Sequence, residues 1–170
     1  ASPLAWLIIL FKRKNIIYAF SYLLLIRIAL IALTTYIFLN KIYKKRGNGE
    51  KLEFWKVLFS VMYALSGYVL ISYTNIMWLD VVAIFPIFCL GIHRLLTQNK
   101  SGLFVVTLTL SLIISYYISY MILFFILSCL PFAVFLYAKK EDRKRVAGKF
   151  IMAVLLSLFL FNSKLPIVLL

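Results

Sequence analysis

The chain has 170 residues, of which 65% are hydrophobic and only 14% charged, and its mean hydropathy is +1.02. Soluble domains average about 45–50% apolar and about 25% charged residues, so this much apolar surface cannot be hidden in a core and must face lipid. The formal net charge is +14. Its basic residues separate long apolar runs, as in membrane loops, which predicts the lipid bilayer as a partner and argues against nucleic acid.

The first apolar runs differ in length. A helix needs about 20 apolar residues to cross the hydrocarbon core, so residues 1–11 predict only an interfacial or re-entrant piece before Lys12-Arg13-Lys14. Residues 16–39 are long enough to span, and Arg27 is their only charge. This run ends at a basic segment followed by Gly47-Asn48-Gly49, which predicts a flexible polar turn.

Residues 57–92 form an apolar run with one charge, Asp80. A single helix over this run would measure about 54 Å, nearly twice the thickness of the hydrocarbon core, so the run predicts a helical hairpin. Its tip is expected at residues 73–80, where polar and aromatic side chains are typical of the membrane interface. Pro86 falls inside the second arm, where spanning helices tolerate proline.

Residues 103–138 carry no charge and have the same length as the first hairpin, so they predict a second one with its tip near residues 115–120. A further apolar segment begins at residue 146. The fold class expected is all-α: a polytopic transmembrane helix bundle with about six membrane segments. The expected helices are residues 16–42, 55–73, 79–96, 103–116, 119–138 and 146–162.

These helices are expected to form a single transmembrane domain over residues 1–170. The chain starts without Met and stops within an apolar run, so we expect it to be a fragment of a longer protein. Residues 41–56, 93–100 and 139–149 together hold 14 of the 19 Lys and Arg residues. Loops with this bias face the cytoplasm. The triplet Lys12-Arg13-Lys14 runs against this orientation.

Asp80 is the one acidic residue expected on the outer side, because the other four lie among cations in the basic loops. An ionisable group at the membrane boundary is costly and therefore a functional candidate. Asp80 could accept a proton from an incoming hydroxyl, or hold a divalent cation that bridges a lipid phosphate. The alternative is a structural cap at the start of the third helix.

Arg27 is expected near the middle of the bilayer, eleven residues into its helix. Its guanidinium could meet a phosphate or a carboxylate in the bundle interior, or it could snorkel or bind backbone carbonyls. Trp78, with Tyr116, Tyr117 and Tyr120, could form a platform for a sugar or prenyl chain, or an ordinary interfacial aromatic belt. The sequence contains no P-loop, GxGxxG, HExxH or nucleophile-elbow motif.

Three stretches, taken together, resemble the YfhO-type bacterial membrane protein family. The first is Tyr63-Ala64-Leu65-Ser66-Gly67-Tyr68, followed by Asn75-Ile76-Met77-Trp78-Leu79-Asp80; the second is Pro86 with Gly91-Ile92-His93-Arg94-Leu95-Leu96; the third is Tyr116-Tyr117-Ile118-Ser119-Tyr120-Met121. Ser2-Pro3-Leu4 and Arg27 also fit the segment that precedes them. The sequence departs from the family pattern at Ser115, where Asn is usual, and at Ser119, where Gly is usual.

The resemblance implies part of a polytopic glycosyltransferase of the GT-C fold in a bacterial cell membrane. Such a protein takes a sugar from a polyprenyl-phosphate donor on the outer face and transfers it to a cell-wall polymer such as lipoteichoic acid. The leading catalytic acid of such folds lies in an outer loop that would precede Ala1, so Asp80 is a secondary candidate and the fragment alone is expected to be inactive. Arg27, Asn75, Trp78 and the three tyrosines are candidates for substrate or lipid-phosphate binding. A transporter or lipid flippase is the alternative function.

Overall fold

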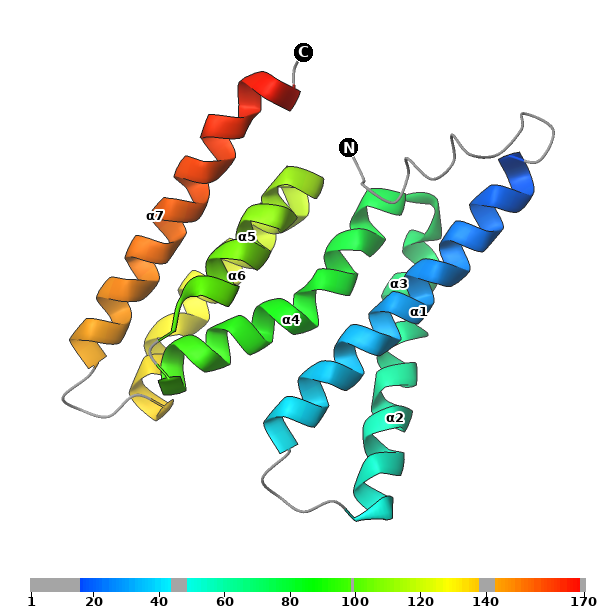
Figure 1. The fold of residues 1–170 in the computed structure, drawn as a ribbon, viewed down its shortest axis with the longest axis horizontal. Helices are drawn as coiled ribbons and strands as arrows, with labels where there is room; N and C mark the ends of the chain where they lie inside the picture. Colours follow the sequence, from blue (N-terminus) through cyan, green and yellow to red (C-terminus); the bar gives the residue numbers. More distant parts are fainter. Residues whose placement is uncertain (1–15, 44–48, 99, 138–142, 169–170) are drawn as a thin grey trace. The chain divides into compact units, whose positions relative to one another are not determined.

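A computed structural model describes residues 16–43, 49–98, 100–137 and 143–168, and all regular structure in these ranges is helical. The elements are α1 (Ile16–Tyr43), α2 (Glu50–Ala64), α3 (Gly67–Ile71), the 3₁₀ helix η4 (Ser72–Thr74), α4 (Ile76–Gln98), α5 (Gly102–Ile114), α6 (Tyr116–Tyr137) and α7 (Arg143–Val168) (Figure 1). The expected all-α class is confirmed. The expectations for residues 1–11, for Lys12-Arg13-Lys14 and for the basic segments within 44–48 and 138–142 lie outside the described residues.

Four described segments are long and apolar enough to cross a membrane: Tyr18–Tyr43, Glu50–Thr74, Trp78–Gln98 and Arg145–Asn162. Two shorter apolar helices, Gly102–Ile114 and Tyr116–Cys129, make up the second expected hairpin. The chain is therefore a membrane protein built from apolar helices.

The helix α1 buries one narrow stripe and exposes apolar side chains on its other faces. The buried stripe repeats every four residues, as one face of an α-helix requires: Ala19, Leu23, Arg27, Ile31 and Thr35. Tyr22, Leu25 and Leu33 are more than half exposed although they are apolar or aromatic. A water-soluble helix would place such residues inside, so this exposed surface is suited to lipid.

The helix α2 also exposes large apolar side chains, and what it buries is small or polar. Its buried residues are Lys56, Ser60 and Ala64, again four residues apart. Its exposed residues include Phe54, Trp55, Phe59 and Met62. Small side chains at a helix interface let two backbones approach closely, which is how membrane helices pack in place of burying large apolar groups.

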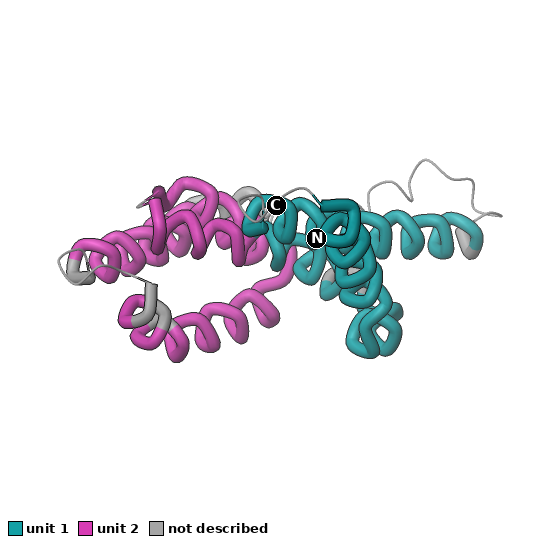
Figure 2. Tube along the Cα trace, turned by 90° about the horizontal axis from the view of Figure 1, so that it is seen from below, with its two compact units in different colours: residues 1–87 teal, residues 88–170 magenta. Residues whose placement is uncertain are grey.

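The chain divides into two compact units, residues 1–87 and residues 88–170 (Figure 2), and the division falls within α4. In the first unit α1 packs against α2. Its apolar core is a cluster from α1, α2, α3 and α4: Ile31, Ala64, Val69, Leu79 and Ala83. In the second unit, three buried rings from α4, α5 and α7 pack in series, with centroids 5.1 Å apart from Phe88 to Phe104 and from Phe104 to Phe150.

Both expected hairpin turns occur, each with its own local geometry. The first arm of the first hairpin is interrupted at Leu65 and Ser66, between α2 and α3, and the chain reverses between η4 and α4 (Figure 1). The second hairpin turns through the single residue Ser115, which has extended backbone angles. The Ser115 amide donates to the carbonyl of Ser111, and the Ser115 carbonyl accepts from Ser119, so one residue ends α5 and begins α6.

Candidate functional site

The side chain of Arg27 points into the first unit and is only 1% exposed. It occupies the middle of the buried stripe of α1, between Leu23 and Ile31. This excludes the snorkelling alternative in this conformation, because a snorkelling arginine extends along the lipid-facing surface toward water. It agrees with the other alternative, in which the guanidinium meets an anionic group inside the bundle.

Asp80 lies in the second turn of α4, which begins at Ile76, and its side chain is 4% exposed. The capping position belongs to Asn75, whose carbonyl accepts the amide of Trp78. The interpretation of Asp80 as the cap of this helix is therefore wrong. The helix starts earlier than expected, because the four residues before Asp80, from Ile76 to Leu79, already form its first turn.

Arg27 and Asp80 form an ion pair. The Arg27 Nε–H donates to Asp80 Oδ1 at 2.7 Å, a short distance that is typical of charge-assisted hydrogen bonds. A longer contact of 3.5 Å joins Arg27 Nη1 to the carbonyl of Leu23, one turn earlier in α1. The two candidates that stood out separately in the sequence therefore meet, and their pair connects α1 to α4.

Buried apolar residues lie beside both members of this pair along their helices. Ile31 follows Arg27 by one turn of α1, Leu79 precedes Asp80 in α4, and both are fully buried members of the core cluster. In such a medium a charge is costly unless it is paired, and removing one partner of a buried pair typically costs about 3–5 kcal/mol.

The segment before Asp80 is exposed, in contrast to the ion pair. Tyr73, Thr74 and Asn75 are all exposed, and Trp78 is half-buried. The amide of Asn75 donates to the carbonyl of Ser72 at 2.9 Å, and the carbonyl of Asn75 accepts from Trp78 at 2.9 Å. We refer to residues 73–75 as the first tip; its polar groups are accessible and its backbone is hydrogen-bonded to the start of α4.

The predicted tyrosines gather at the start of α6, in the second unit. Tyr116, Tyr117 and Tyr120 are each just over half exposed and line an open hollow of about 410 Å³ together with Met121 and Phe124. The ring centroid of Tyr116 lies 5.2 Å from that of Tyr120 and 6.0 Å from that of Phe161 in α7. This hollow combines apolar walls with phenolic hydroxyls, as a site for an amphipathic ligand would. Trp78 belongs to the first unit and is not among its lining residues.

Ser119, one residue before Tyr120, is fully buried, and its hydroxyl has no hydrogen-bond partner among the described residues. The family pattern usually has Gly at this position. A fully buried position with no space to solvent explains that preference, because Gly adds no polar atom that needs a partner.

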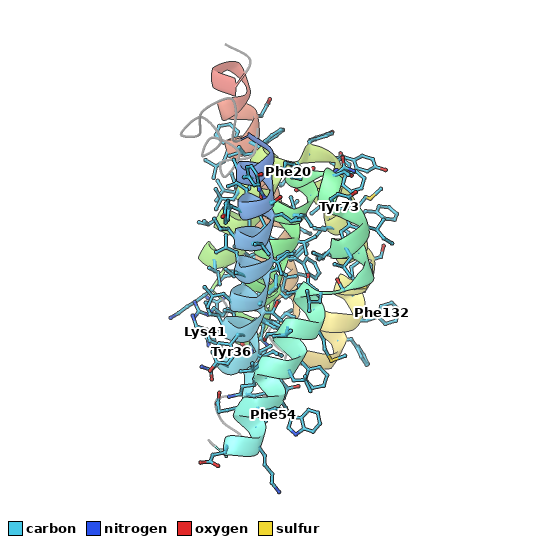
Figure 3. All side chains as sticks on the ribbon, turned by 90° about the vertical axis from the view of Figure 1, so that its right-hand side faces the viewer. Phe20, Tyr36, Lys41, Phe54, Tyr73 and Phe132 are labelled. Carbon is cyan, nitrogen blue, oxygen red and sulfur yellow. The ribbon has the colours of Figure 1, made fainter. Side chains whose placement is uncertain are left out.

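A second polar cluster was not predicted from the sequence. The Lys56 ammonium, 2% exposed, donates to Glu53 Oε1 at 2.7 Å and to Asn40 Oδ1 at 3.2 Å, while the Tyr36 hydroxyl donates to Glu53 Oε2 at 3.0 Å. This cluster joins α1 to α2. Tyr36 and Phe54 lie near one end of the first unit, and Phe20 and Tyr73 lie at its other end (Figure 3). The signal that could have revealed the cluster is the four-residue spacing of Lys56, Ser60 and Ala64.

Within the described ranges, no group of three or more His, Cys, Asp and Glu side chains is placed to hold a metal ion. At Asp80 the positive charge is supplied by Arg27, which engages one carboxylate oxygen. The two cysteines, Cys89 and Cys129, are both free thiols.

The sequence was compared with curated proteins, solved structures and protein-family models. No curated protein and no solved structure matches the chain. The family model described as bacterial membrane protein YfhO matches residues 1–165, which is nearly the whole chain. The chain therefore belongs to the YfhO family of bacterial membrane proteins.

Proposed function

We propose that this chain is part of a membrane glycosyltransferase that moves a sugar from a polyprenyl-phosphate donor to a cell-wall polymer at the outer face of the bacterial membrane. The observation that carries the proposal is the Arg27–Asp80 pair, which lies inside an apolar bundle directly behind the exposed first tip. Ionisable groups within membrane segments are expensive, so they mark functional regions. The reaction comes from the resemblance to the YfhO family, whose members look like glycosyltransferases of the GT-C fold.

Accessible groups would bind the substrates in this proposal. Asn75 at the first tip offers an amide to sugar hydroxyls or phosphate, and Trp78 offers a ring face beside it. The hollow of Tyr116, Tyr117 and Tyr120 has the mixed character of a sugar joined to a prenyl chain. Groups that bind substrate must be accessible, whereas both members of the ion pair are buried.

The chemistry asked of such a site is a displacement at the anomeric carbon. A base takes the proton of the acceptor hydroxyl, the acceptor oxygen bonds to the sugar carbon, and the bond from that carbon to the phosphate breaks. Asp80 is a secondary candidate for this base, since its carboxylate is already bound to Arg27. The resemblance implies a leading acid in an outer loop that precedes Ala1.

One observation favours the alternative function of transporter or flippase. The membrane segment that contains α2 and α3 is interrupted at Leu65 and Ser66. Interrupted helices expose backbone groups within the membrane, and transporters use such groups to bind substrates.

A transfer assay on the full-length protein separates the two functions. Purified protein is reconstituted in vesicles with a radiolabelled sugar on polyprenyl phosphate and with a teichoic-acid-type acceptor. We expect label in the polymer and release of polyprenyl phosphate. Movement of the donor across the bilayer without labelled polymer would overturn the proposal in favour of the flippase.

A further inference from the structure

The two charged residues of the ion pair are shielded from any bound substrate. Arg27 is 1% exposed and Asp80 is 4% exposed, while Tyr73, Thr74 and Asn75 a few residues away are exposed. A lipid phosphate could reach the guanidinium only after the helices had separated around it. The pair and the substrate-binding surface are therefore different parts of one site.

A short, hydrogen-bonded segment of backbone connects them. Asp80 is five residues after Asn75, and the intervening residues are the first turn of α4. Hydrogen bonds from Asn75 to Ser72 and from Trp78 to Asn75 join the first tip to that turn. A displacement of Asp80 along or around α4 must move the first tip by a similar amount.

We infer that Arg27 and Asp80 are a positioning pair, which fixes the start of α4 against α1 and thereby holds the first tip in place for substrate. This inference rests on the proposed function. The apolar contacts of Ile31, Leu79 and Ala83 in the same cluster hold the helices together, but the hydrophobic effect that drives them is non-directional. The 2.7 Å bond from Nε to Oδ1 is directional, so it favours the register in which the two side chains meet.

A double substitution separates positioning from simple stabilisation. In R27M/D80L the full-length protein loses both charges; Met is close to Arg in volume and Leu is larger than Asp, and an apolar replacement of a buried ion pair is often neutral or stabilising. In R27D/D80R the charges are exchanged and a pair can form again. Tip position is measured as the distance between spin labels at Tyr22→Cys and Thr74→Cys, two exposed sites in the first unit, in a background without other cysteines.

We expect the unsubstituted pair to give one narrow distance distribution. R27M/D80L is expected to accumulate in the membrane, to give a broad distribution, and to lose about 100-fold in transfer rate, as misplacement of a substrate-binding group by about 1 Å can cause. R27D/D80R is expected to restore the narrow distribution and at least a tenth of the transfer rate. A narrow distribution in R27M/D80L would overturn the inference.

The experiment also gives an answer if R27M/D80L does not accumulate or if no sugar is transferred. If R27M/D80L does not accumulate, R27D/D80R decides: a narrow distribution supports the positioning pair, and a broad one overturns it. If the unsubstituted protein transfers no sugar, the proposed function fails, while the spin-label distances still show whether the pair sets the position of the first tip.

Discussion

Two cations of the first unit are almost fully buried, and their carboxylate partners differ in exposure. Arg27 and Lys56 are 1% and 2% exposed, whereas Asp80 is 4% and Glu53 is 39% exposed. A buried ion that loses its partner keeps its desolvation cost, but an exposed ion can return to water. Removing the charge of Lys56 and removing the charge of Glu53 should therefore lower the stability of the protein by different amounts.

We predict that Glu53→Gln lowers the thermal unfolding midpoint more than Lys56→Met does. The Gln variant leaves the buried ammonium without an opposite charge, although Asn40 still accepts a hydrogen bond from it. The Met variant removes that ammonium and leaves Glu53 partly hydrated and bound to the Tyr36 hydroxyl. Both midpoints are measured in the same detergent. A larger loss for Lys56→Met would show that the ammonium is not buried as described.

At the residue scale the sequence predicted single candidates but not their pairing. Arg27 and Asp80 stand out because each interrupts an apolar run. Their meeting could not be predicted, because α1 is apolar on its lipid-facing side and on its buried side alike, so no pattern shows which way Arg27 points. The sequence places Lys56 at the end of a basic loop, where a lysine is usually hydrated, so it does not predict that Lys56 is buried.

At the element scale, one close approach of two helices depends on a glycine. A Cβ on Gly91 of α4 would lie 2.9 Å from both the Cα and the amide nitrogen of Phe104 in α5, and 3.3 Å from the carbonyl carbon of Leu103. Backbone atoms cannot move aside as a side chain can. Phe104 is also the middle one of the three packed rings in the second unit, so a shift there would disturb two ring contacts.

We predict that Gly91→Ala destabilises the protein by about 1–3 kcal/mol, the usual cost of overpacking a close contact. Gly148→Ala is the matched control, because a Cβ at this helical position meets nothing within 4 Å. Ala at an open helical site should be neutral or should stabilise by up to about 1 kcal/mol. The free energies of unfolding are compared in one detergent. Equal effects of the two substitutions would contradict the close approach of α4 and α5.

The helices themselves follow from length and hydrophobicity, whereas their exact ends follow from local hydrogen bonding. The expected start of the third helix at residue 79 is three residues later than the observed start at Ile76, because polar and aromatic residues there were assigned to a turn. The break at Leu65 and Ser66 was not expected, since neither residue interrupts an apolar run by its composition. Local hydrogen bonds mark both features: the amide of Trp78 donates to the carbonyl of Asn75, and the amide of Leu70 donates to the carbonyl of Ser66.

At the scale of the whole molecule, the orientation in the membrane stays a prediction. In the first unit Tyr36 and Tyr73 lie at opposite ends (Figure 3), as two sides of a membrane require. We expect Asn75→Cys and Tyr117→Cys to react with a membrane-impermeant thiol reagent in intact cells, because the hairpin tips face outward. Asn48→Cys and Gln98→Cys should react only after the cells are opened. Labelling of Asn48→Cys but not Asn75→Cys in intact cells would reverse the orientation.

The central claim is that Arg27 of α1 and Asp80 of α4 meet inside a membrane bundle, and cross-linking in native membranes tests it most directly. The full-length protein carries R27C/D80C, no other cysteines, and a protease site inserted between Arg46 and Gly49. The control is I26C/D80C, because Ile26 neighbours Arg27 but lies on the exposed side of α1. After treatment with a short bifunctional thiol reagent and protease, we predict that R27C/D80C runs as one band in denaturing gels and I26C/D80C as two. Two bands for R27C/D80C, or one band for both variants, would contradict the account.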